Sequence, residues 1–157
     1  MQPYAALVDD GSTDDEREWD TMEAIYTAAA TANGRDGRAV STDGQLDLAL
    51  ALPPALGGDG KGTNPEQLFA AGYAACFSSA LAMIARGEKI DVSEVSVTAE
   101  VTVGKDEVGF GLDVALRVEL PEGLAGEPGE KLVERAHQVC PYSRAVRGNV
   151  PVTLIVE

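Results

Sequence analysis

The apolar stretch from Gly62 to Arg86 constrains the fold of this chain more than any other segment. Thr63 or Asn64 can cap a helix at its start, and Gly87 follows its end as a natural stop. The residues between them form about six helical turns with almost no polar face, so we expect burial on all sides. The stretch therefore predicts a central core helix that carries Cys76 in its middle.

The length and the net charge of the chain restrict its domain organisation and its partners. A chain of 157 residues most simply forms one domain with a substantial core. Its formal net charge of -14 argues against nucleic acids and anionic membranes as partners. Residues 1–21 are acidic and lack an apolar period, so we expect a disordered extension before a single domain at residues 22–157.

The start of the chain and its two cysteines bear on the compartment. The first residues lack the basic start and the apolar run of a signal peptide, and we expect no later segment to span a bilayer. A reducing cytoplasm is then the expected location, where cysteines are more often free, catalytic or redox-active than bridged. Both cysteines can equally be small buried hydrophobic residues.

The remaining elements are strands and one further helix. Strand-like alternation of apolar residues occupies residues 24–31, 38–42, 46–52, 95–103, 112–120 and 150–156. Residues 128–140 have the spacing of an amphipathic helix. The order β-β-β-α-β-β-α-β predicts an α+β domain with an antiparallel sheet packed on the central helix. Because that helix needs more cover than one sheet gives, we expect a tight homodimer.

Four residues outside the expected core can carry chemistry: Cys76, Cys140, Arg35 and Glu66. A thiolate in the middle of a helix gains little from the helix dipole, so a reactive Cys76 would need a nearby cation. Arg35 could supply it, because guanidinium stays charged when buried, and Glu66 could hold its fork. The alternative is that Arg35 is a solvated turn residue and Glu66 an ordinary carboxylate at a helix N-terminus.

Spacing limits how these residues can meet. Glu66 and Cys76 are ten residues apart, which is roughly 15 Å along a continuous helix. Either the helix breaks near Gly72, or the Glu66 and Arg35 that serve one Cys76 come from a partner chain. We favour the second arrangement, which makes the site a dimer-interface site.

Other groups give weaker signals. Phe77, Phe110 and Tyr142 can be core residues, or they can wall an apolar pocket beside the cysteines. The cysteines and the single histidine lack metal-site spacing, and no dinucleotide or phosphate-binding motif is present, so we expect no bound metal or nucleotide cofactor.

Three segments resemble the organic hydroperoxide resistance proteins of the osmotically inducible protein C superfamily. They are YTAAATANGRDGRA at residues 26–39, GTNPEQLFAAGYAACF at 62–77 and AHQVCPYSRAVRGN at 136–149. The motifs occur in the family's order, include both cysteines and, with the strands between them, cover nearly everything after Met22. The acidic extension before Met22 departs from the family pattern.

The resemblance implies a two-cysteine thiol peroxidase that reduces organic and lipid hydroperoxides to alcohols. The roles it implies are a peroxidatic Cys76, a resolving Cys140, an activating Arg35 and its carboxylate partner Glu66. It also implies an intertwined homodimer with the site at the subunit interface. The implied reductant is an external dihydrolipoyl group on a lipoylated protein, so no cofactor is bound.

Three alternatives remain open at this point. A relative of this superfamily could prefer hydrogen peroxide or another oxidant. The same disulfide could serve a non-enzymatic redox sensor, although no basic DNA-reading element is present. The cysteines could also be inert in a structural or ligand-binding domain. The sequence identifies neither the physiological hydroperoxide nor the particular lipoylated partner.

Overall fold

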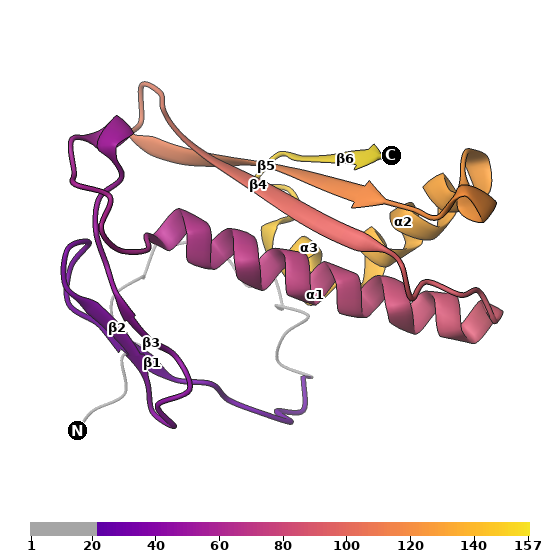
Figure 1. Cartoon of the computed structure of the whole chain (residues 1–157), viewed down its shortest axis with the longest axis horizontal. Coiled ribbons are helices and arrows are strands. Elements are labelled where there is room, and N and C mark those ends of the chain that lie inside the picture. Colours follow the sequence, from indigo (N-terminus) through magenta and orange to yellow (C-terminus); the bar gives the residue numbers. More distant parts are fainter. Residues whose placement is uncertain (1–21) are drawn as a thin grey trace, which may run out of the picture.

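The computed structural model describes residues 22–157, so the extension expected at residues 1–21 lies outside the described residues. The chain forms six strands, three α-helices and two short 3-10 turns in this region. In chain order they are β1 (Ala30–Ala32), β2 (Arg38–Ser41), β3 (Asp47–Ala49), η2 (Pro54–Leu56), α1 (Pro65–Glu88), β4 (Ser96–Lys105), β5 (Phe110–Glu119), η3 (Glu122–Leu124), α2 (Glu127–Val139), α3 (Pro141–Val146) and β6 (Val152–Val156). The expected α+β order is confirmed (Figure 1).

The central helix α1 is continuous over 24 residues. Its N-cap is Asn64, whose side chain accepts a hydrogen bond from the backbone N–H of Gln67 at 2.9 Å. Gly87 does not stop the helix, which instead ends at Lys89 in the left-handed conformation, with φ of 59°. The N–H of Ile90 donates to the carbonyl of Ala85, and the Ile90 side chain packs against the core. Tertiary packing thus decides where this helix ends.

Only one face of α1 is buried within the single chain, which corrects the expectation of burial on all sides. The buried face consists of Tyr73, Phe77, Ala80, Leu81 and Ala85. Met83, on another face, is 58% exposed. By length and composition alone α1 could cross a bilayer, contrary to the expectation from the sequence, but in this fold it packs against β4, α2 and α3.

One sheet covers the buried face of α1 (Figure 1). Strands β4 and β5 form the expected long antiparallel pair, in register from Ser96 opposite Glu119 to Lys105 opposite Phe110. Strand β6 pairs parallel to β5, because α2 and α3 carry the chain back between the two strands. Val114, Leu116 and Val118 of β5 are fully buried and form the centre of the core together with α1 and α2.

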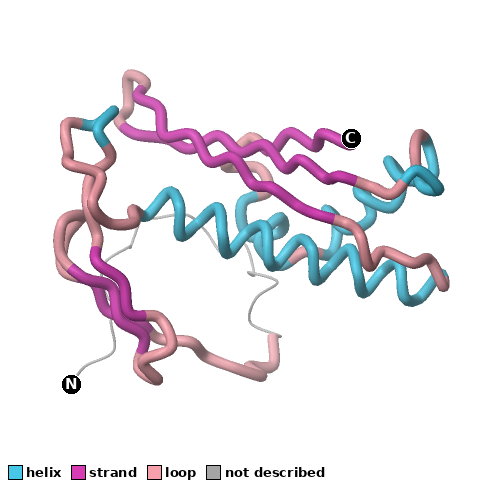
Figure 2. The backbone as a smooth tube through the Cα atoms, viewed as in Figure 1, coloured by secondary structure: helices cyan, strands magenta, loops and turns pink. Residues whose placement is uncertain are grey.

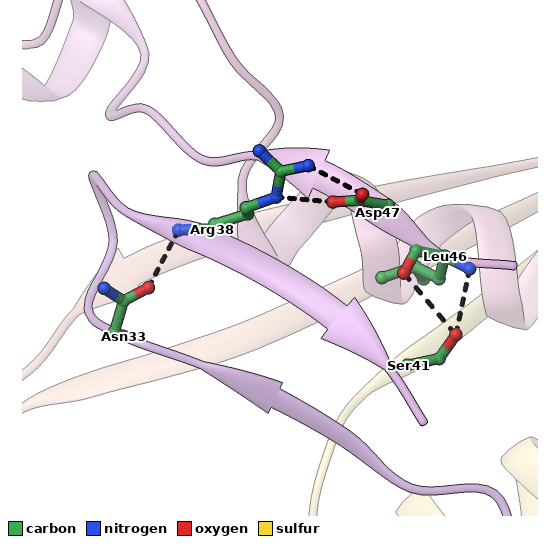
Figure 3. Close-up of polar contacts among 5 residues, drawn as sticks. All are labelled: Asn33, Arg38, Ser41, Leu46 and Asp47. Atoms are coloured by element: carbon green, nitrogen blue, oxygen red, sulfur yellow. Dashed lines mark hydrogen bonds and ion pairs between the residues drawn. The ribbon is translucent and has the colours of Figure 1, made fainter. Parts of the chain in front are cut away.

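The first three strands form a separate antiparallel meander. It lies on the other side of α1 from the β4–β6 sheet, near the N-terminal end of the helix (Figure 1). The Arg38 guanidinium donates two hydrogen bonds to Asp47, at 2.5 and 2.6 Å, and so joins β2 to β3 (Figure 3). The Asn33 side chain accepts from the N–H of Arg38 at 3.0 Å and shapes the turn before β2.

The first strand is shorter than the alternation at residues 24–31 predicts. Only Ala30–Ala32 pair with β2, and residues 22–29 have no regular structure. This segment runs clear of the helix and sheet (Figure 2), with Ile25 97% and Tyr26 81% exposed. A strand-like pattern cannot form a strand where the chain offers it no neighbour.

Candidate active site

The two cysteines lie together where α1 meets the bend between α2 and α3. Cys76 is in the middle of α1, and Cys140 is at the bend where α2 ends and α3 begins. Their Sγ atoms are 3.6 Å apart, and both thiols are free. Cys140 is fully buried, whereas Cys76 is partly exposed. An oxidant arriving from solvent therefore meets Cys76 first, with Cys140 directly behind it.

The bend that presents Cys140 is fixed from both sides. Pro141 starts α3, where the missing N–H of proline costs no helical hydrogen bond. The Arg147 guanidinium donates to the carbonyls of His137 and Gln138, at 3.1 and 3.4 Å, and so ties the end of α3 to the end of α2. These carbonyls lack helical partners, so Arg147 satisfies them and holds the two helices at a fixed angle.

Within one chain the surroundings of Cys76 disfavour its thiolate. Burial is the largest influence and raises the pKa of the Cys76 thiol. A hydrogen bond from the backbone N–H of Tyr142 acts in the opposite direction, and the neighbouring Cys140 adds to the rise in pKa. To react as a thiolate, Cys76 therefore needs a nearby positive charge from elsewhere.

Arg35 and Glu66 form the ion pair that the sequence suggested. Arg35 lies in the turn before β2, Glu66 lies in the first turn of α1, and their side chains are hydrogen-bonded. The Glu66 side chain is 16% exposed and that of Arg35 46%. Burial alone would raise the pKa of Glu66, but hydrogen bonds from Arg35 and from its own backbone N–H outweigh burial and lower it. Glu66 is thus held as a carboxylate.

This ion pair and the thiol pair do not meet within one chain. Helix α1 passes through Gly72 without a break, so the expected alternative of a broken helix is wrong. The ten residues between Glu66 and Cys76 then correspond to roughly 15 Å along the helix axis. Of the four residues suggested for the site, the fold brings together Cys76 with Cys140, and Arg35 with Glu66.

Three aromatic rings pack together between α1 and α3, and one of them belongs to Tyr142, whose backbone N–H contacts Cys76. Tyr142 packs against Phe69 and Tyr73, with ring centroids 6.0 and 5.6 Å away. A Cβ at Gly72 would lie 2.8 Å from the Tyr142 hydroxyl, so this glycine is what lets the ring approach the helix. The buried Tyr73 hydroxyl donates to Oγ of the buried Ser143 at 2.9 Å.

The suggested pocket residues lie in different places. Phe77 is fully buried in the core, and Tyr142, 39% exposed, lies beside the cysteines. Phe110 is at the start of β5, 79% exposed, with the Lys105 ammonium 5.9 Å from its ring centroid. A mainly apolar groove runs beside Glu66, between η2, the start of α1 and β4; its walls include Pro53, Leu56, Ala70, Val101 and Val103.

Similarity to known proteins extends over most of the chain. Residues 58–155 match the family of OsmC-like proteins. An organic hydroperoxide resistance protein from Xanthomonas axonopodis pv. citri is 53% identical over 135 residues, which cover 84% of this chain and 94% of that protein. The chain belongs to the OsmC-like family, among its organic hydroperoxide resistance proteins. OhrA of Bacillus subtilis, another such protein, is 49% identical over 139 residues, or 85% of this chain and 97% of OhrA.

Solved structures of this family share the fold. An organic hydroperoxide resistance protein from Legionella pneumophila superposes with a TM-score of 0.81 at 52% identity, covering 86% of this chain and 99% of that one. A putative organic hydroperoxide resistance protein from Vibrio cholerae, with captopril bound in one of its active sites, has a TM-score of 0.79 at 48% identity. That match covers 87% of this chain and 94% of the other.

Three residues of this region gave no separate signal in the sequence: Phe69, Tyr73 and Ser143. Two of them belong to an apolar helix in which nearly every residue suits a core. Their relation to the cysteines becomes visible only when α3 is docked on α1. One hint exists in the spacing, because Tyr73 is three residues before Cys76 and Ser143 three residues after Cys140, one helical turn in each case.

Proposed function

We propose that this protein is a thiol peroxidase that reduces organic and lipid hydroperoxides to alcohols through Cys76 and Cys140. One observation carries the proposal: two free thiols lie 3.6 Å apart, one partly exposed and the other fully buried. The names of the relatives from Xanthomonas axonopodis and Bacillus subtilis supply the class of substrate.

The chemistry follows from this order of access. The Cys76 thiolate attacks the distal oxygen of the hydroperoxide, the O–O bond breaks, and the alkoxide takes up a proton and leaves as an alcohol. Cys76 becomes a sulfenic acid. The Cys140 thiol then displaces water from it and forms a disulfide, which an external dithiol reduces by exchange. Because Cys140 is already in contact, it can react before a second hydroperoxide overoxidises Cys76.

A second copy of the chain completes the site in this proposal. A thiolate at Cys76 would need a nearby cation to offset its raised pKa, while the Arg35–Glu66 pair lies at the N-terminal end of α1. The uncovered face of α1, the separate meander and the exposed Ile25 and Tyr26 all offer surface to a partner. Arg35 and Glu66 of one copy then serve Cys76 of the other in an intertwined homodimer.

The substrate and reductant follow from the surroundings and from the family resemblance. The aromatic rings at the cysteines and the apolar groove beside Glu66 suit alkyl or fatty-acid hydroperoxides better than hydrogen peroxide. The reductant that we propose is a dihydrolipoyl group on a lipoylated protein in the cytoplasm.

A coupled turnover assay tests the function. The substrates are tert-butyl or fatty-acid hydroperoxide and hydrogen peroxide, and the reductants are dihydrolipoamide and thioredoxin. We expect fast turnover only with an organic hydroperoxide and dihydrolipoamide. Cys76→Ser should abolish it, and Cys140→Ser should permit one reduction before the enzyme stalls or overoxidises. Normal multiple turnover in either variant would rule out the two-cysteine mechanism. A wild type that consumes no peroxide with both thiols intact would favour a sensor or an inert domain.

A further inference from the structure

A second contact between α1 and α3 runs beside the thiol pair. The Tyr73 hydroxyl donates to Ser143 Oγ at 2.9 Å, and both residues are 0% exposed. Tyr73 lies one turn before Cys76 on α1, and Ser143 lies one turn after Cys140 on α3. The hydrogen bond and the sulfur pair therefore span the same interface side by side.

The position of Cys140 depends on this interface. Helix α3 has only six residues, too few for a helix to be stable without tertiary contacts. Arg147 ties α3 to α2, whereas α3 meets α1 through side-chain packing, the hydrogen bond from the Tyr142 N–H to Cys76 and the hydroxyl pair. An S–S bond is about 2.05 Å long, so the sulfur atoms, now 3.6 Å apart, need only a short movement to bond.

We propose that the Tyr73–Ser143 hydrogen bond is a positioning device that holds Cys140 against Cys76 and thereby sets how readily their disulfide forms. When both thiols are already held in place, forming the disulfide costs little conformational entropy. A loosened α3 must first become ordered, which makes the disulfide less favourable. The hydrogen bond and the disulfide thus stabilise each other. Both hydroxyls belong to fully buried residues, so they act through the position of Cys140. The consequence for turnover rests on the proposed function: weaker positioning leaves the sulfenic acid of Cys76 open to a second hydroperoxide for longer.

The equilibrium between the reduced and disulfide forms in a glutathione buffer tests this directly, because it requires no hydroperoxide. The thiols are alkylated at a series of buffer ratios, and mass spectrometry of the full-length protein gives the effective concentration of the cysteine pair. In Tyr73→Phe and in Ser143→Ala we expect this concentration to fall about three- to tenfold, the range for one net hydrogen bond. The double variant should fall no further than the single ones, because either change already removes the bond.

Ser79→Ala is the matched control. It removes another hydroxyl of α1, one turn on the other side of Cys76, which donates only to its own helix at the carbonyl of Ala75. The effective concentration should stay at the wild-type value in this variant. A purely structural role for Tyr73 and Ser143 would lower the melting temperature of both redox forms equally and leave the disulfide equilibrium unchanged.

Two results would overturn the inference: single variants that match Ser79→Ala, or a double variant whose loss is the sum of the single losses. The proposed peroxidase function is tested independently of this inference. If the wild type shows no peroxidase activity while the glutathione equilibrium shifts as expected, the positioning role stands and the peroxidase proposal falls.

Discussion

The proposed chemistry depends first on one residue, Cys76, whose thiol must ionise to react. Its pKa is raised, chiefly by burial, so at neutral pH its own chain leaves it mostly protonated and a poor nucleophile. Arg35 is the cation that we propose to reverse this, with Glu66 holding its guanidinium in place. The reactivity of Cys76 would then depend on a residue that lies far from it in the single chain.

Substitution of Arg35 should therefore change the pH dependence of Cys76. In a Cys140→Ser background, Arg35→Ala removes the stabilising charge, which raises the pKa of Cys76 and lowers the thiolate fraction at any pH below it. We expect alkylation by iodoacetamide to slow several-fold at neutral pH and to recover as the pH rises.

Arg38→Ala is the control for this substitution, because Arg38 is in the same region but pairs with Asp47. Its alkylation profile should match that of the unchanged background. If Arg35→Ala gave this same profile, Arg35 would have no part in activating Cys76.

At the scale of elements, local patterns predicted the start of α1, strands β4 and β5, and helix α2 well. Each of these is specified by its own residues: an Asn64 cap, strict apolar alternation, or an amphipathic stripe. The end of α1, the short β1 and the parallel pairing of β6 were not predicted. These depend on contacts with distant segments, such as the packing of Ile90 on the core.

The residues of the candidate site show the same difference between what local sequence specifies and what distant contacts decide. Both cysteines and the Arg35–Glu66 pair could be named from the sequence, because thiols and ion pairs have recognisable chemistry. Tyr73 and Ser143 could not, because a buried hydroxyl pair depends on how α3 docks on α1. The docking of α3 also explains the glycine at position 72 of α1, because a side chain there would collide with the Tyr142 ring.

Two glycines of α1 give a prediction about this docking. Gly87 faces open space, so Gly87→Ala should stabilise the protein by up to about 1 kcal/mol through helix propensity alone. Gly72→Ala gains the same propensity but sets a methyl group 2.8 Å from the Tyr142 hydroxyl, so the ring must move. We expect urea unfolding to show a clearly smaller gain, or a loss, at Gly72. Equal gains at both positions would mean that the approach of Tyr142 to α1 does not constrain the fold.

At the scale of the whole molecule, the single chain leaves the site divided and much apolar surface uncovered. The meander and the residues before it stand away from the helix and sheet, and the ten-residue strand β4 forms an edge of its sheet (Figure 1). Long exposed edges and apolar faces are usually covered in native proteins. A second copy would cover them and would bring a guanidinium to each Cys76.

Mixing a variant that lacks the activating cation with one that lacks the reactive thiol tests whether one site is shared between two copies. Arg35→Ala and Cys76→Ser are unfolded, mixed and refolded together, mass spectrometry verifies the mixed dimers, and turnover of an organic hydroperoxide with dihydrolipoamide is measured. If Arg35 serves the Cys76 of the other copy, each mixed dimer has one complete site, and random pairing should restore roughly a quarter of wild-type activity. No recovery in the presence of verified mixed dimers would contradict a peroxidase site shared between two copies.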